Sequence, residues 1–455
     1  MRSRLRFAAL LGAALLLAVT LHQPPSAHAA PAAALPSDRL HFGLANGPAD
    51  LGWMTSSQVP WRYRYQYLCC GVNTGSGWET WNSPTGQFAA WYMANSTSGG
   101  ASYIPVFTYY ELLQSNPAVG SNELDKDYSN LNNASTMASY YANFKLLMTL
   151  ANTYGKTVIV HVEPDFWGYM QQKAKANGWS AANQVPAQVA GSGSSDLSGY
   201  ADTLQGFACG LMHLRDLYDP NGNVLLGIHA SMWSSGLDVA SSTDPTLDAV
   251  AQADLTSSFL NSACMASNPY GGGTWDLVFN DIDDHDAGWW ESHGNNQWFT
   301  HWWDPTNTTF PNFARYLGWV SELHAKTSRP QVVWQVPVGN QYFLTMNNTC
   351  GHYQDNVAQY ILAHPQSFKA AGLIAVLFGA GNTCQSTYTD AANDGVTNNS
   401  GVATTDLAGF CAACNTHVPT WPDDDGGFLR VFVGRYYGNR LPIIQSSPAP
   451  SPRPR

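Results

Sequence analysis

Charged residues are scarce in this chain of 455 residues, because Asp, Glu, Lys and Arg together make up only 12% of it. Basic residues are the rarer kind, with 21 Lys and Arg against 32 Asp and Glu, and the formal net charge is −11. Such a chain lacks the basic surface with which proteins bind nucleic acids or anionic membranes. We therefore expect neither of them as a partner.

Several catalytic motifs are also absent from the sequence. There is no Gly-x-Ser-x-Gly elbow of an α/β-hydrolase esterase and no His-Glu-x-x-His zinc motif. A glycine-rich phosphate loop, which an open nucleotide-binding sheet carries after its first strand, is missing too. After the N-terminus, no stretch approaches the roughly eighteen apolar residues that a membrane-spanning helix needs. We expect an enzyme or binding protein that needs no cofactor.

The N-terminus has the pattern of a secretory signal peptide. Three arginines precede an apolar run over residues 7–19, and an Ala-x-Ala site ends at Ala29. We predict a signal peptide over residues 1–30 and a short leader over residues 31–37. Cleavage would remove three arginines and leave 18 basic against 32 acidic residues, a net charge of −14. The mature protein is expected to be secreted, extracellular and monomeric.

Eight cysteines in an exported chain are more typical of disulfides than of a metal site. Cys209 and Cys264 fall on helix-like segments that follow neighbouring strand-like segments, so we predict that they pair. We also predict a bond between Cys350 and Cys384. The remaining cysteines leave more than one pairing open, with Cys69 or Cys70 bonded to Cys411 or Cys414.

Eight strand-like segments alternate with helix-like ones, which predicts parallel strands with helical crossovers. The fold class that fits is α/β: a single (β/α)8 barrel of the TIM type over residues 38–445, with long loops at its C-terminal face. Residues 428–437 are expected to form one more strand or a closing element, and the Pro/Ser-rich tail over residues 446–455 to be disordered. The predicted strands are Leu40–Asn46, Arg62–Leu68, Tyr103–Tyr110, Thr157–Asp165, Leu225–Ser231, Asp276–Asp283, Gln331–Val338 and Gly372–Gly379.

Two carboxyl groups stand at the end of the fourth predicted strand, in the sequence Val162-Glu163-Pro164-Asp165. Because strand residues alternate between faces, His161, Glu163 and Asp165 should share one face. Pro164 cannot donate to a sheet ladder, so regular pairing should end beside it. Acids at the C-terminal end of a barrel strand are typical of an active site.

Polar residues of other strands should converge on the same mouth. The sixth strand supplies Asp281 and Asp283, the fifth supplies His229 and the seventh supplies Gln335. Outer barrel faces are covered by helices and should be apolar, so these residues are expected to point inward. By the same reasoning we expect Arg64 and Gln66 to join them from below.

Two carboxyl groups across a cleft perform glycoside hydrolysis directly, one protonating the leaving oxygen and the other activating water or attacking the sugar. We predict that Asp165 or Glu163 is the general acid and that Asp281 or Asp283 is the base or, less readily, the nucleophile. The chain is rich in aromatics, at 13%, and such rings stack on sugars. The remaining predicted contacts to a carbohydrate substrate are Tyr109, Glu111, His161, Trp167, His229, Trp233, Asp286, Trp289 and Gln335.

The stretch Glu163-Pro164-Asp165 resembles the strand end of family-6 glycoside hydrolases, the cellobiohydrolase and endoglucanase type. Residues 281–286 are similar to the Asp-x-x-Asp-x-Asp segment of that family, although there the segment precedes Glu-Pro-Asp and here it follows. The resemblance implies that Asp165 is the general acid and that Asp281 supports it.

Other interpretations of the same residues remain open. The seventh strand has no acid, which favours a carbohydrate-binding barrel without catalysis. The aspartates of residues 281–286 also suit a Ca²⁺ loop or a solvated turn. A polysaccharide lyase or deacetylase with a bound cation is the third alternative.

Overall fold

The computed structural model describes residues 35–294, 297–339, 355–379 and 428–438. The predicted signal peptide, most of the leader, the tail and the predicted Cys350–Cys384 bond lie outside these residues.

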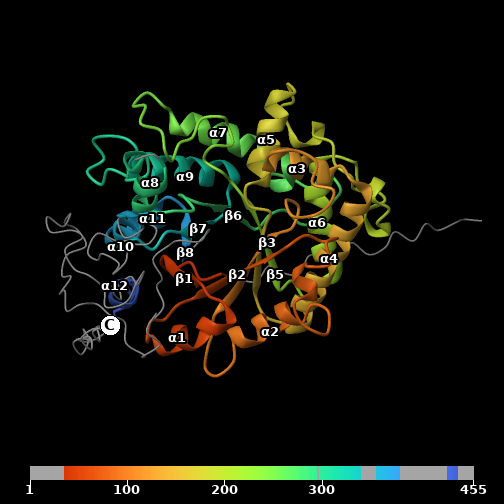
Figure 1. The fold of residues 1–455 in the computed structure, drawn as a ribbon, viewed down its shortest axis with the longest axis horizontal. Coiled ribbons are helices and arrows are strands. Elements are labelled where there is room, and N and C mark those ends of the chain that lie inside the picture. The colour runs from red at the N-terminus through yellow and green to blue at the C-terminus, as the bar shows by residue number, and fades with distance from the viewer. Residues whose placement is uncertain (1–34, 295–296, 340–354, 380–427, 439–455) are drawn as a thin grey trace, which may run out of the picture.

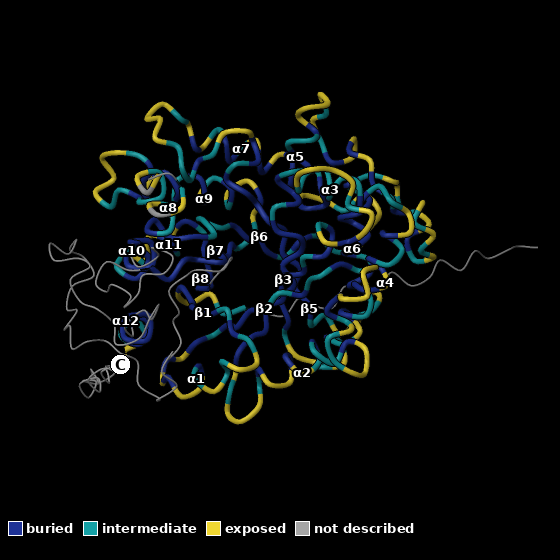
Figure 2. The backbone as a smooth tube through the Cα atoms, viewed as in Figure 1, coloured by how far each residue is buried: buried dark blue, intermediate teal, exposed yellow. Residues whose placement is uncertain are grey.

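Eight parallel strands close into one barrel in chain order, with β1 paired to both β2 and β8 (Figure 1). This confirms the (β/α)8 prediction. Each strand is buried on both faces, which explains why the strands are runs of apolar residues rather than alternating ones (Figure 2). The strands are β1 His41–Ala45, β2 Tyr63–Cys69, β3 Ile104–Tyr110, β4 Val158–Val162, β5 Val224–His229, β6 Leu277–Asn280, β7 Gln331–Val336 and β8 Leu373–Phe378.

Helices surround the barrel and cover its outer face (Figure 1). Side-chain caps set several starts, as where Asn133 accepts from the backbone N–H of Thr136 at the start of α4. The helices are α1 Leu51–Ser56, α2 Gln87–Ser96, α3 Glu123–Leu131, α4 Ala134–Tyr154, α5 Phe166–Ala176, α6 Leu204–Tyr218, α7 Ala249–Leu260, α8 Ala287–His293, α9 Phe313–Thr327, α10 Val357–Ala363, α11 Pro365–Ala370 and α12 Phe428–Tyr436.

Residues 428–436 form helix α12, so a ninth strand there is wrong and a closing element is right. Its apolar side chains are buried, and the Tyr436 hydroxyl donates to the carbonyl of Leu40 at 2.9 Å. Arg430 donates to the carbonyl of Ser57 at 3.2 Å. The helix therefore fixes the N-terminal region at β1.

The second strand has the opposite orientation to the predicted one. Tyr63 and Tyr65 belong to the apolar cluster inside the barrel, whereas Arg64 points outward and is fully buried. Its guanidinium donates to Asn46 Oδ1 at 3.1 Å and Ser96 Oγ at 3.2 Å, and lies 3.9 Å from the centroid of the Tyr92 ring. The prediction was wrong because a buried arginine satisfied by neutral acceptors can sit under a helix.

Cys209 and Cys264 form the predicted disulfide, with Cα atoms 5.3 Å apart. Cys69 and Cys70 pair with no other described cysteine, and their predicted partners lie outside the described residues. Among the described helices, none is long and apolar enough to cross a membrane.

Candidate active site

A cavity of about 840 Å³ opens at the C-terminal ends of the strands, where barrel enzymes carry their active sites. Side chains from β2, β3 and β7 and from the segments after β3, β4, β5 and β6 line it. Its carboxyl groups are Glu123, Asp165, Asp238, Asp281, Asp283 and Asp284, and its aromatic rings are Tyr67, Tyr110, Tyr169, Trp233, Trp290 and Trp334.

The backbone at the end of β4 separates the two carboxyl groups that the sequence places together. Glu163 has a φ of 47° and Asp165 a φ of 64°, in the left-handed region that non-glycine residues rarely adopt. The strand alternation therefore stops after Val162, and only Asp165 reaches the cavity. Strained backbone of this kind clusters at functional sites.

Glu163 is fully buried and holds the adjoining loop. Its carboxyl oxygens accept from the backbone N–H groups of Glu111, at 3.1 and 3.2 Å, and Leu112, at 3.3 Å. Glu111 in turn accepts from the N–H of Gly71 at 2.8 Å. Burial raises the pKa of Glu163 to about 8 and that of Glu111 to about 9. The two carboxyl groups connect the ends of β2, β3 and β4.

Asp165 has a different environment. Burial, and then the negative charge of Asp281, raise the pKa of Asp165 to about 7, so near neutral pH it holds a proton that it can give up. Asp165 and Asp281 both line the cavity, from the segments that follow β4 and β6. Neither Glu163 nor Glu111 lines the cavity.

Two histidines lie beneath Asp281 inside the barrel. Nε2 of His229 is 3.3 Å from Oδ1 of Asp281, although not aligned as a hydrogen bond, and Nδ1 of His229 is 3.0 Å from Nε2 of His161. If His161 donates to His229, the proton of His229 must be on Nε2, facing Asp281. The His161 ring stacks on Phe279 with centroids 4.1 Å apart, which fixes its orientation.

Asp283 and Asp284 belong to a separate group on the same wall. Asp283 contacts Nε2 of His301 at 3.0 Å and accepts from the Trp290 indole N–H at 3.2 Å. Burial raises the pKa of Asp283 to about 6, and the hydrogen bond from His301 limits the rise. For Asp284, burial alone would raise the pKa, but hydrogen bonds with His285 and Asp283 and the charge of His285 together hold it below the ordinary value.

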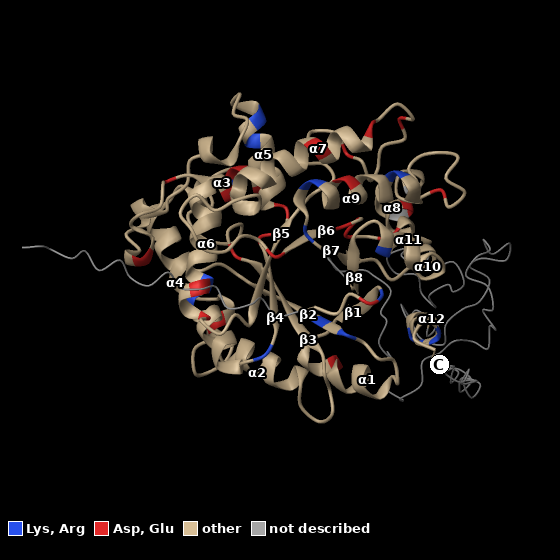
Figure 3. Ribbon diagram, turned by 180° about the vertical axis from the view of Figure 1, so that it is seen from behind, with Lys and Arg blue, Asp and Glu red and all other residues tan. Residues whose placement is uncertain are grey.

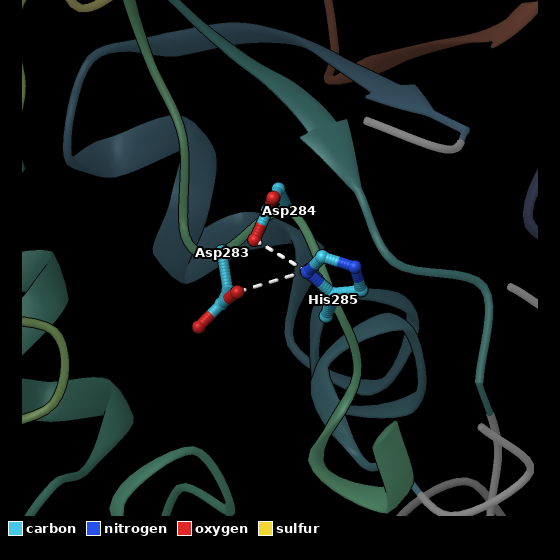
Figure 4. Close-up of side chains that lie close together, drawn as sticks. All are labelled: Asp283, Asp284 and His285. Carbon is cyan, nitrogen blue, oxygen red and sulfur yellow. Dashed lines mark hydrogen bonds and ion pairs between the residues drawn. The ribbon is translucent and has the colours of Figure 1, made fainter. Parts of the chain in front are cut away.

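Potential metal ligands in the described part of the chain gather at Asp283, Asp284 and His285, which each offer one atom within 4.8 Å of the others (Figure 4). In Figure 4 both carboxyl groups are joined by dashed lines to His285. The backbone N–H of His285 donates to Asp283 at 2.9 Å, and Nδ1 of His285 is hydrogen-bonded to Asp284 at 2.7 Å. The group therefore holds itself together through hydrogen bonds.

Five of the thirteen predicted site residues line the cavity, namely Asp165, Asp281, Asp283, Trp233 and Gln335. Gln335 does so because β7 has an irregular register and Gln335 has a φ of 58°, which turns its side chain inward beside Trp334. It accepts a hydrogen bond from the Tyr67 hydroxyl at 2.5 Å.

Two aromatic residues expected at the rim are core residues instead. Tyr109 is on the outer face of β3 and donates to Asn143 on α4 at 2.9 Å. Trp167 is 1% exposed and donates to the carbonyl of Val162 at 2.9 Å. Both predictions gave the wrong surroundings, since an aromatic residue near a strand end can turn either to the cavity or under a helix.

The other predicted contacts lie around the cavity rather than in its lining. Asp286 is buried and caps α8 by accepting from the N–H of Trp289 at 2.9 Å. Trp289 stacks on His285 at 3.7 Å between centroids, and its neighbour Trp290 reaches the cavity. His161 and His229 act from below.

Sequence reasoning missed several lining residues. Tyr67 and Tyr110 could have been found from the alternation of side chains along a strand. Tyr67 shares the inward face of β2 with Tyr65, and Tyr110 shares the inward face of β3 with Val106. Glu123, Tyr169 and His301 come from helices and loops whose approach to the mouth no local pattern shows.

No family model matches this chain, and no curated protein sequence matches it. Among similar solved structures is a modular endo-β-1,4-mannanase from Cellulomonas fimi, with a TM-score of 0.42, 11% identity, and coverage of 77% of this chain and 67% of that one. Another is GH26C from a Muricauda species, with a TM-score of 0.40, 9% identity, and coverage of 75% of this chain and 79% of that one. An endoglucanase from Mycobacterium tuberculosis has a TM-score of 0.27 and 12% identity, with coverage of 63% of this chain and 65% of that one. These values assign no family, and the fold assignment stands on the strand pairing itself.

Proposed function

We propose that the protein is a secreted glycoside hydrolase that cleaves a polysaccharide or oligosaccharide. The observation that carries the proposal is that Asp165 and Asp281 both line one aromatic-lined cavity at the barrel mouth. Glycoside hydrolysis needs a protonated carboxyl group and an ionised one on opposite sides of the scissile bond. An exported monomer remains our proposal for its location and state.

In this proposal Asp165 is the general acid. Its raised pKa keeps the proton available near neutral pH, and no described side chain competes as a hydrogen-bond acceptor for it. The proton passes to the glycosidic oxygen as the bond to the anomeric carbon breaks. Glu163 is excluded from this role because it lies behind the lining and is bonded to the backbone.

Asp281 is then the base that activates water, or the nucleophile. His229 lies beneath it, with Nε2 at 3.3 Å from Oδ1 of the Asp281 carboxyl group. Asp283 is engaged by His301 and Trp290, which leaves it a supporting role at this wall.

Aromatic rings in the cavity provide surfaces for sugars. The centroids of the Tyr169 and Trp233 rings lie 4.6 Å apart, and the Trp290 ring stacks on His301 with centroids 4.0 Å apart. Rings of this kind contact the C–H faces of a pyranose while hydroxyl and indole N–H groups bond its edge.

The test is release of reducing ends from a panel of polysaccharides by wild type beside Asp165→Asn. Turnover that disappears in the variant supports the proposal. Sugar-dependent tryptophan quenching without turnover would identify a binding protein instead. Unsaturated products, or activity that needs a stoichiometric metal, would favour the cation-dependent lyase or deacetylase that Asp283, Asp284 and His285 suggest.

A further inference from the structure

The charge of the cavity is one-sided. Six carboxyl groups line it, and its described lining contains no Lys or Arg. Figure 3 shows acidic segments in the middle of the molecule, beside the labels of β5 and β6. A neutral glycan needs only the two carboxyl groups that carry out hydrolysis.

Nearly every segment that follows a strand lacks Lys and Arg. Residues 65–125, 216–314, 330–368 and 370–429 contain no Lys and no Arg. On α5, which follows β4, Lys175 donates to the carbonyl of Ser235 at 2.9 Å and Lys173 lies over the Tyr128 ring. Neither lysine lines the cavity. No Lys or Arg of the described lining therefore neutralises the acids, and the one histidine there, His301, is engaged with Asp283.

One corner of the cavity combines a carboxyl group with aromatic faces. Glu123, at the start of α3, accepts from the Tyr110 hydroxyl at 2.6 Å, its one hydrogen-bond partner among the described side chains. The Tyr169 and Trp233 rings line the same cavity. Helix α3, which carries Glu123, packs against helix α5, which carries Tyr169, and Lys173 of α5 lies over the Tyr128 ring of α3.

Such a corner suits a positive charge. An ammonium group over a Trp or Tyr ring is attracted by the ring face, and a carboxylate beside the ring adds an ion pair. A cleft lined by charge of one sign also concentrates ligands of the opposite sign. The most direct way for a sugar to carry that charge is a free amino group.

We propose that the substrate is a polysaccharide of amino sugars whose amines are not acetylated, with the ammonium group of the sugar next to the scissile bond held by Glu123 against the paired rings of Tyr169 and Trp233. The inference rests on the proposed function. The amine is only bound, so the hydrolytic step at Asp165 and Asp281 is unchanged.

The test compares polyglucosamine and polygalactosamine with the same polymers after complete N-acetylation, and with a neutral mannan and glucan. We expect kcat/KM for a free-amine polymer to exceed that for its acetylated form by at least about tenfold, and to fall when salt rises from about 0.01 M to about 1 M. Glu123→Gln should raise KM for the free-amine polymer several-fold and leave kcat nearly unchanged. Glu322→Gln, which removes a carboxylate on α9 paired with Lys326, should change neither.

The outcomes separate the two proposals. Cleavage of a neutral or acetylated polymer in preference to the free-amine form would overturn the amino-sugar inference but would still support the proposed glycoside hydrolase activity. If no polymer is cleaved, the proposed glycoside hydrolase activity itself is overturned. Hydrolysis of a neutral polymer that stops with a chelator and returns with Ca²⁺ would assign the surplus carboxyl groups to a metal, and would also overturn the inference.

Discussion

Two pairs of carboxyl groups lie at the ends of barrel strands, and they differ in their access to solvent. Glu111 and Glu163 are sealed from solvent, and backbone N–H groups donate to both oxygens of Glu163 and to Oε2 of Glu111. Asp165 and Asp281 open to the cavity, and the described residues give them no contact to backbone N–H groups. Burial raises the pKa of both glutamates and of Asp165. A shifted pKa alone therefore does not distinguish a reactive carboxyl group from a structural one, whereas access does.

Removal of the Asp165 carboxyl group should have the largest effect. We expect Asp165→Asn to lower kcat by about 10²–10⁴-fold, because a positioned general acid contributes on that order. Wild-type kcat should fall as pH rises through about 7, where Asp165 loses its proton. Initial rates on the best polymer of the panel measure both effects.

Asp254→Asn on α7, which removes a half-exposed carboxylate paired with Lys326, is the matched control and should keep full activity. The thermal unfolding midpoint of Asp165→Asn should stay near that of wild type. Full activity in Asp165→Asn would end its assignment as the acid.

Loss of the Glu163 side chain should affect folding rather than chemistry. Glu163→Ala leaves the N–H groups of Glu111 and Leu112 without their acceptor. An unsatisfied buried donor costs about 1–3 kcal/mol, so the free energy of unfolding should fall by about 2–6 kcal/mol. Urea unfolding followed by tryptophan fluorescence measures the change.

The same side chain predicts a pH dependence of stability. A carboxyl group whose pKa is raised in the folded state binds its proton more tightly there. Its contribution to stability is thus present at low pH and is lost as pH rises from the ordinary value of 4.5 towards about 8. Unfolding midpoints should fall between pH 5 and pH 8 in wild type and fall less in Glu163→Gln. Equal slopes in the two proteins would contradict the ionisation of Glu163 in this range.

The sequence predicted the barrel because each buried parallel strand is an apolar run long enough to recognise alone, and because the alternation with helices leaves few topologies. The prediction that Asp165 and Asp281 lie at the same barrel mouth used only two observations. Both residues stand at strand ends, and strand side chains alternate between two faces, which we call parity. Parity failed at Glu163, because a left-handed residue there breaks the two-residue repeat, and nothing in Val-Glu-Pro-Asp signals that turn.

Parity failed in strand β2 for another reason. Both of its faces are buried, so either set of alternate residues could have pointed inward. The choice depends on Asn46 and Ser96, which accept hydrogen bonds from Arg64 and come from other elements. Contacts of this range, like that between Glu123 and the cavity, follow from the packed fold and leave no local pattern.

The smallest effect expected is a shift of the pH profile on replacement of His229, and it sharpens the difference between the two acids of the cavity. His229 lowers the pKa of Asp165, so its loss should raise the pKa of that carboxyl group. His229→Asn should therefore move the alkaline limb of the kcat/KM profile, where Asp165 loses its proton, to higher pH. His213→Gln on α6, stacked on Tyr200 away from the cavity, should leave the profile in place. A merely structural role for His229 would lower the rate at every pH without moving that limb, and that result would show that the histidine does not act on Asp165.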